Sequence, residues 1–245
     1  MLARPIAGLA LVLALALTAT ACSAAPDQPP PSQRPGIGLM TTLPLIWGEG
    51  VDVGELLTSD APGNWVRQAL ERRFMLEPLD VLDEASLAAL EGLILAQPRA
   101  LSGQENVALD AWVRRGGTVL LFADPMLTRR SRFPIGDRRR PQDVVLLSPI
   151  LARWSLTLLF DEEQAQGERI VEIGGVRMPL NIYGRFEVQR GSRCVLAGGG
   201  VLAICPVGRG KVVALADAAV LDDEPSSAAI RGRALDRLLQ LAFAG

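Results

Sequence analysis

The chain has 245 residues, 49% of them hydrophobic, and carries 25 basic against 27 acidic side chains for a formal net charge of −2. This slightly acidic balance argues against nucleic acid as the main partner. The chain contains no histidine, which excludes Ser-His-Asp and Cys-His triads, histidine general bases and histidine-based zinc sites. We assign no metal and no cofactor.

The first residues have the pattern of an export signal. Residues 1–21 contain one early Arg, an apolar run and then small residues, which is typical of a secretory signal peptide. The residues at 19–22, Ala-Thr-Ala-Cys, resemble the lipobox of bacterial lipoproteins. We therefore expect Cys22 to be acylated and to hold the protein on a membrane without a spanning helix, with simple cleavage as the alternative.

The residues after Cys22 predict a tethered domain. Residues 22–36 are rich in Pro and small polar residues, which favours an extended tether without a core. Residues 37–245 suit one α/β domain with an extra lobe, or two small ones, and we assign them to one. We expect a lipid-anchored protein of the bacterial cell envelope that faces the periplasm, with the outer membrane slightly favoured by Ser23 after the cysteine.

The stretch 101–125 can be interpreted almost residue by residue. Ser102 and Glu105 have the S-x-x-E spacing of a capping box, so a helix begins directly after Ser102. Apolar residues then recur on one helical face, and a Gly-Gly pair at 116–117 can supply a left-handed helix end. The apolar run at 118–123 lacks alternation, as expected for a strand covered on both faces of a parallel sheet.

The rest of the N-terminal half repeats this alternation of strands and helices. The expected strands are 37–42, 75–79 and 93–96, and the expected helices are capped by Asp60 and Asp83. The order β-α-β-α-β-α-β with right-handed crossovers predicts a parallel, doubly wound sheet of flavodoxin-like type.

The C-terminal half adds antiparallel structure to this sheet. A helix over 144–154, with a second start at its Ser-Pro pair, precedes a strand over 156–160, and apolar segments around glycine turns predict hairpins. The remaining expected elements are a hairpin at 169–178, strands at 186–189, 193–197, 201–205 and 211–216, and a helix at 226–243.

Cys194 and Cys205 lie in the two arms of an expected hairpin whose turn is the glycine run 198–200. If the loop centres on the glycines, the thiols are cross-strand neighbours and can form a disulfide in an oxidising compartment. A register shift of one residue would turn them to opposite faces as two buried thiols. The sequence leaves both arrangements open.

Three blocks of sequence carry a family resemblance: LSGQENVALDAWVRRGGTVLLFADP at 101–125, LLSPILARWSLTLLFDE at 146–162 and GRGKVVALADAAVLDDE at 208–224. In this order they resemble the extracytoplasmic domain of auxiliary proteins of uncharacterised ABC-type transport systems, a group that includes the gliding-motility-associated auxiliary component. The resemblance implies a class I glutamine-amidotransferase-like α/β sandwich. It also implies ABC transporter subunits, or other envelope proteins, as partners.

True class I amidotransferases carry their nucleophile in a G-x-C-x-G turn after a central strand. The matching position here reads Ala-Asp-Pro-Met-Leu, without a thiol, and the chain has no histidine to activate one. We therefore expect the protein not to be an enzyme.

Carboxylates follow two strands at the edge where open α/β sheets bind ligands. Asp124 and Asp217 each end a parallel-type strand, so they can converge on one crevice and hold a hard cation or do acid–base work. Trp47 and Glu49, in the first loop after a strand, can line the same crevice. The alternative is that the aspartates cap helices and turns and that Trp47 belongs to the core.

The segment 128–142, called the arginine loop below, holds six arginines among Gly and Pro. Guanidinium forks bind phosphate, lipid headgroups and acidic partners in a bidentate manner, and the alternative is a solvated loop without a ligand. The six are Arg129, Arg130, Arg132, Arg138, Arg139 and Arg140.

The anchor, the resemblance and the missing nucleophile predict a non-catalytic lipoprotein that is an accessory or binding component of an ABC-type transport system. The rival hypothesis is a carboxylate-dependent hydrolase or carbohydrate-active enzyme that uses Asp124 and Asp217. A purely structural envelope protein is the third alternative.

Overall fold

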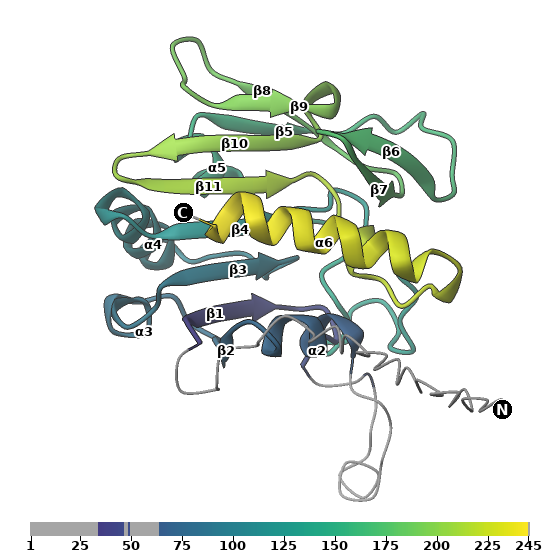
Figure 1. Cartoon of the computed structure of the whole chain (residues 1–245), viewed down its shortest axis with the longest axis horizontal. Helices are drawn as coiled ribbons and strands as arrows, with labels where there is room; N and C mark the ends of the chain where they lie inside the picture. Colours follow the sequence, from purple (N-terminus) through teal and green to yellow (C-terminus); the bar gives the residue numbers. More distant parts are fainter. Residues whose placement is uncertain (1–33, 47–48, 50–63, 245) are drawn as a thin grey trace, which may run out of the picture.

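A computed structural model describes residues 34–46, 49 and 64–244 of the protein (Figure 1). The expected signal peptide, most of the tether, Cys22, Trp47 and Asp60 lie outside the described residues. Within the described ranges, no helix combines the length and apolar character needed to cross a membrane.

A seven-stranded sheet forms the centre of the domain, in the order β2-β1-β3-β4-β11-β10-β9 (Figure 1). Neighbours from β2 to β11 are parallel, and β10 and β9 extend the sheet antiparallel. The strands are β1 (Gly36–Thr41), β2 (Met75–Pro78), β3 (Gly92–Ala96), β4 (Thr118–Phe122), β9 (Val195–Ala197), β10 (Leu202–Val207) and β11 (Gly210–Leu215).

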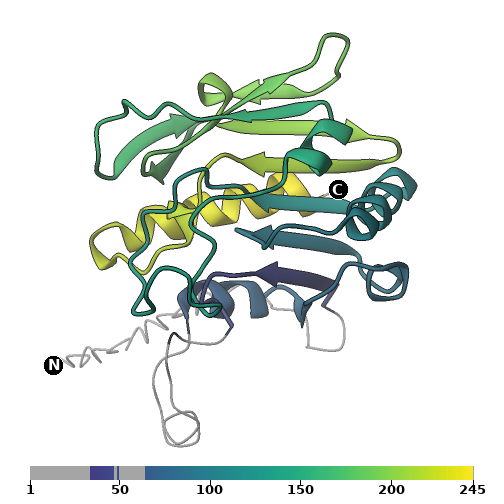
Figure 2. The same ribbon diagram turned by 180° about the vertical axis from the view of Figure 1, so that it is seen from behind.

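Helices cover both faces of this sheet, so its central strands are apolar without alternation. Every residue of β3 and all but the first of β4 is buried. Helices α2 (Trp65–Glu71) and α6 (Ala228–Phe243) pack on one face, together with the hairpin of β6 (Arg169–Ile173) and β7 (Val176–Leu180). Helices α3 (Glu84–Ala88), α4 (Gly103–Arg115) and α5 (Ser148–Arg153) cover the other face, with β5 (Leu156–Leu159) and β8 (Arg185–Val188) (Figure 2).

The expected α/β class, with a mostly parallel sheet and added antiparallel hairpins, is confirmed. Helix α4 begins after a Ser102 and Glu105 capping box and ends at Gly116, which has φ +128°. Helix α3 is likewise capped by Asp83, and the glycine run 198–200 forms the turn before β10. Local chemistry thus fixes these boundaries, because each cap satisfies backbone groups that the helix itself cannot.

Two helices differ from the expectation. The first described helix, α2, is capped by Asn64, whose side chain accepts hydrogen bonds from Val66 and Arg67 N–H. The expected helix over 144–154 is helical only from Ser148. Its first residues are not helical, and Val145 N–H donates instead to the carbonyl of Asp124, two residues after β4.

The hairpin register brings Cys194 and Cys205 together. Strand β9 pairs with β10 so that Val195 lies opposite Ile204, which places the preceding cysteine opposite Cys205. The two residues form a disulfide, with Cα atoms 4.1 Å apart. Of the two arrangements that the sequence left open, the structure has the bonded one.

Candidate functional site

The carboxyl ends of β1, β3, β4 and β11 meet at one edge of the sheet. Gln97, directly after β3, is buried there and has φ +46°, an uncommon value for a residue with a side chain. Its Oε1 accepts from Asp124 N–H at 2.9 Å, and its Nε2 donates to the carbonyls of Asp124 (3.0 Å) and Gln142 (2.9 Å). Gln97 therefore joins β3, β4 and the end of the arginine loop, a role that the sequence did not indicate.

Asp124 and Asp217 converge at this edge, but water does not reach them. Asp124 is 1% exposed and accepts from Met126 N–H at 2.8 Å and Ala218 N–H at 3.3 Å. Asp217 is 0% exposed and accepts from the N–H groups of Asn181 (2.7 Å) and Ala219. Each carboxyl thus closes local backbone turns, as in the capping alternative.

Burial dominates the protonation of this pair. It raises the pKa of Asp124 to about 7, because a charged carboxylate loses its hydration. It also raises the pKa of Asp217 well above the usual range, and the neighbouring Asp124 adds to the effect. Carboxyl groups this deeply buried cannot contact a large substrate directly. Their burial therefore corrects the hypothesis that Asp124 and Asp217 carry out hydrolysis.

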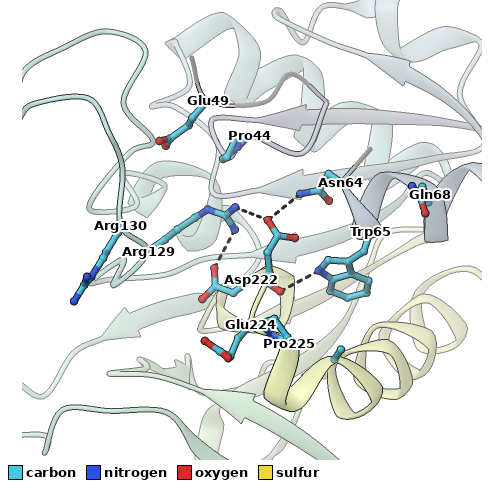
Figure 3. Close-up of a pocket in the computed structure, with 12 residues that line it drawn as sticks. Pro44, Glu49, Asn64, Trp65, Gln68, Arg129, Arg130, Asp222, Glu224 and Pro225 are labelled. Atoms are coloured by element: carbon cyan, nitrogen blue, oxygen red, sulfur yellow. Dashed lines mark hydrogen bonds and ion pairs between the residues drawn. The ribbon is translucent and has the colours of Figure 1, made fainter. Parts of the chain in front are cut away.

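An open crevice of about 570 Å³ lies beside this edge, within the size range of small-ligand sites. It lies between the start of α2, the loop after β1, the arginine loop and the connection from β11 to α6 (Figure 3). Its chemically distinctive lining residues are Glu49, Trp65, Arg129, Asp222, Asp223 and Glu224.

Arg129 fixes the charged wall of the crevice. Its guanidinium reaches Asp222 Oδ1 at 3.1 Å through Nη1 and Asp223 Oδ2 at 2.9 Å through Nη2 (Figure 3). Its side chain is only 15% exposed. Burial raises the pKa of Asp222 above its usual range, although the positive charges of Arg129 and Arg231 oppose the rise.

Trp65 closes the crevice on the opposite side. Its indole Nε1–H donates to the carbonyl of Asp222 at 3.0 Å, so the ring is held against the β11–α6 connection. Nothing in the sequence around Trp65 indicates this role. Nothing local in the sequence shows that an indole and an arginine will face the carboxylates at 222–224.

A second cavity of about 590 Å³ adjoins the crevice and shares Arg129, Asp222 and Asp223 with it. Its far wall includes Asn181 at the end of β7 and Arg231 of α6. Arg231 is buried, pairs with Glu168 and donates to the carbonyl of Ala219.

Of the other residues that the sequence singled out, Glu49 lines the crevice beside Arg129 and Asp222, which Asp124 and Asp217 do not line, and its Oε2 accepts from Arg132 N–H at 2.9 Å. Ion pairs within the arginine loop hold some of its side chains in place, so it is not only a solvated loop. Arg139 pairs with Asp137 at 2.7 Å and Arg140 with Asp143 at 2.8 Å. Among the described residues, no group of three or more His, Cys, Asp or Glu side chains is placed to hold a metal ion.

The sequence matches no protein-family model and no curated protein. The fold does recur in solved structures. The exo-β-1,4-mannosidase of Opitutaceae bacterium strain TAV5 has a TM-score of 0.50 at 14% identity, over 85% of this chain and 36% of its own. A GH42 β-galactosidase of G. stearothermophilus, solved as a catalytic mutant, has a TM-score of 0.48 at 13% identity, over 84% and 30%. A cytoplasmic protein of Salmonella typhimurium has a TM-score of 0.45 at 8% identity, over 85% and 99%.

The chain spans about a third of the length of these two glycosidases, and at such identities the likeness concerns the fold. The expectation that the protein is not an enzyme is nevertheless corrected: its fold recurs in the chain of an exo-β-1,4-mannosidase, so the fold gives no ground for excluding an enzyme. The missing histidine excludes only mechanisms that need an imidazole.

Proposed function

We propose that this domain is carbohydrate-active: it binds a saccharide in the crevice between α2, the arginine loop and the β11–α6 connection, and its carboxyl groups act on a glycosidic bond. The observation that carries the proposal is the placing of Trp65 against three successive acidic residues, Asp222 to Glu224, in one open crevice. A sugar presents apolar C–H faces and hydroxyl edges. An indole packs against the C–H faces, and carboxylates, amides and guanidinium groups form hydrogen bonds with the hydroxyl groups.

The chemistry assigns different roles to two carboxyl groups of the crevice. Glycoside hydrolysis needs one protonated carboxyl as the acid and one ionised carboxylate as the base or nucleophile. Asp222 is 24% exposed, and burial raises its pKa, which suits the acid. Glu224 is exposed at the rim, where it is accessible as the base or nucleophile. Arg129 positions Asp222 and does not itself transfer a proton.

Binding and turnover of β-linked manno- and galacto-oligosaccharides, with matching aryl glycosides, test the proposal. Trp65→Ala should weaken saccharide binding about tenfold, because the indole face is lost. Asp222→Asn should lower turnover about 10²–10⁴-fold, since an amide cannot donate the proton, while it leaves binding largely intact.

The matched control is Asp236→Asn. Asp236 is a half-exposed acid of α6 that pairs with Arg73, which is not among the residues lining the crevice. This variant should bind and turn over saccharide as the unaltered protein does. If the unaltered protein binds none of these saccharides, or if Asp222→Asn leaves turnover unchanged, the proposal is refuted.

We infer that the finer fold is of flavodoxin or class I amidotransferase type. The strand order β2-β1-β3-β4-β11 supports this, because it corresponds to the order 2-1-3-4-5 of doubly wound sheets. The position of the crevice, outside the carboxyl ends of parallel strands, also agrees with where such sheets bind ligands.

We also propose that the domain works at the cell envelope through an acylated Cys22, as a partner of an ABC-type transport system. The Cys194–Cys205 disulfide supports an oxidising compartment, and the three resembling blocks support the transporter link. Mass spectrometry of the mature N-terminus and cross-linked pull-down from membranes test the two halves separately. An unacylated N-terminus would refute the anchor, and recovery without an ATPase or permease would refute the link.

A further inference from the structure

The middle of the arginine loop exposes an apolar side chain in a segment rich in arginine. Ile135 is 87% exposed, more than any other large hydrophobic residue in the described part of the chain. Its neighbours Pro134 and Gly136 are also exposed. Such exposure forfeits the free energy of burying an isoleucine, about 1.5–3 kcal/mol, unless something outside the domain covers it.

Some arginines of this loop are paired with carboxylates and others are not. Arg139 lies over the ring of Phe133, 4.2 Å from its centroid, and shares its charge with Asp137. Arg130 and Arg138 are exposed and have no carboxylate partner among the residues that the structure describes. The loop therefore presents unpaired guanidinium groups beside an exposed apolar side chain, although the whole chain is slightly acidic.

We propose that the middle of the arginine loop binds the surface of a membrane that contains anionic phospholipid. Ile135 inserts at the boundary between headgroups and acyl chains, and Arg130 and Arg138 bind lipid phosphates. An apolar side chain next to guanidinium groups suits a bilayer interface. The apolar side chain can enter the acyl-chain region, while the arginines keep their aliphatic stems against it and their charged ends among the phosphates and water. An acidic protein surface would match the charges but would leave Ile135 without an apolar environment.

The chain can place this part of the loop on a membrane to which it is attached. Eleven residues lie between Cys22 and Arg34, the first described residue, and such a segment spans about 40 Å when extended. The loop lies beside the carboxyl ends of β1, β3 and β4 (Figure 2). Crossing a strand such as β1, about 20 Å long, is within that reach. A weak contact then suffices to orient the domain, because attachment raises the effective concentration of the loop at the surface.

This contact would also place the crevice next to the lipid headgroups, because Arg129 and Arg130 belong to the same loop and line the crevice. The membrane contact does not depend on the proposed saccharide chemistry. Its test needs no sugar and no turnover assay.

Co-sedimentation with vesicles tests the proposal. The mature chain with Cys22→Ser, which carries no acyl group, should bind vesicles of phosphatidylcholine with phosphatidylglycerol more tightly than vesicles of phosphatidylcholine alone. Added salt should weaken this binding. Arg130→Gln and Arg138→Gln should each weaken it about fivefold. Ile135→Ser should weaken binding to both kinds of vesicle, because it removes the inserted group.

The matched control is the set Arg190→Gln, Arg193→Gln and Val195→Ser, which removes two exposed arginines and one exposed apolar residue around the β8–β9 turn. It should bind vesicles as the unaltered loop does. A fluorophore on Ile135→Cys should shift to the blue on vesicles and not with inorganic phosphate. Equal binding by loop and control variants would overturn the proposal. So would retention on polyglutamate in the absence of vesicle binding.

Discussion

Asp124 and Asp217 are acids in positions that water does not reach, at the ends of β4 and β11. Their oxygens accept hydrogen bonds from the backbone N–H groups of three segments: the residues between β4 and the arginine loop, the residue after β7 and the turn after β11. Removing either carboxyl would leave buried N–H groups unpaired, which costs about 1–3 kcal/mol for each group. The pair therefore has a structural role, and it makes the stability of the protein depend on pH.

We expect the free energy of unfolding to fall as the pH rises from 5 to 8. Both native pKa values lie above the unfolded value of about 3.9. The stability that the protonated acids contribute is therefore complete below that value and is lost as the pH rises through about 7 for Asp124. Urea unfolding at the two pH values should show a loss on the order of 2 kcal/mol.

Two comparisons test whether these buried acids cause the dependence of the free energy of unfolding on pH. Asp124→Asn cannot ionise, so it should be less stable than the unaltered protein at pH 5 and show a flatter dependence on pH. Glu105 does not interfere, because hydrogen bonds from Arg99 lower its pKa to about 2, so it loses its contribution only in stronger acid. A free energy of unfolding that is constant or rises from pH 5 to 8 would contradict the assignment.

Among the elements, α4 shows how a local motif gains a tertiary role. Ser102 Oγ accepts from Glu105 N–H at 3.2 Å, and Glu105 Oε2 accepts from Ser102 N–H at 2.8 Å, as the S-x-x-E spacing predicts. The same carboxylate also accepts from Leu82 N–H at 3.2 Å and from Arg99 at 2.6 Å. Glu105 thus secures the segment before α3 as well as the start of its own helix.

We expect the two halves of this capping box to differ in their contribution to stability. Ser102→Ala should lower the free energy of unfolding by about 1 kcal/mol, as for an ordinary N-cap. Glu105→Ala should lower it by about 2–4 kcal/mol, because Leu82 N–H and Arg99 also lose their acceptor. Chemical denaturation measures both. Gln104→Ala, exposed in the same helical turn, should stay within about 0.5 kcal/mol, and equal effects of the first two changes would refute the tertiary role.

At the scale of the whole molecule, the fold depends on inserting β11 beside β4. These strands are about 90 residues apart in the sequence, so their pairing closes a large loop. Gly210, at the start of β11, lies so close to the end of α4 that a Cβ there would collide with the carbonyls of Val113 and Gly117. Arg209 N–H donates to the carbonyl of Arg114 at 3.0 Å in the same place.

We therefore expect Gly210→Ala to cost about 3 kcal/mol or more, because backbone atoms cannot move aside as a flexible side chain can. The matched substitution is Gly232→Ala in α6, where a Cβ meets nothing within 4 Å. It should raise stability by about 0.5–1 kcal/mol, since alanine favours the helix. Thermal unfolding should shift in opposite directions for the two variants. A shift of the same sign in both would show that crowding at Gly210 is not the cause.

The sequence by itself determined the local structure of this protein. It placed the strands and most helices of the described part within a few residues, because caps, glycine turns and apolar periodicity act between neighbours in the chain. It also excluded an imidazole from the site and predicted that Asp124 and Asp217 converge, since parallel strands end at one edge.

Only the tertiary structure decided what that edge can do. The sequence could not show that Asp124 and Asp217 are buried, that Gln97 joins two strand ends, or that Trp65 and Arg129 enclose the acids at 222–224. It also left the pairing of Cys194 and Cys205 open. The physical reason is the same in each case: burial and the meeting of distant side chains depend on register and packing across the whole sheet, and no stretch of the sequence encodes them alone.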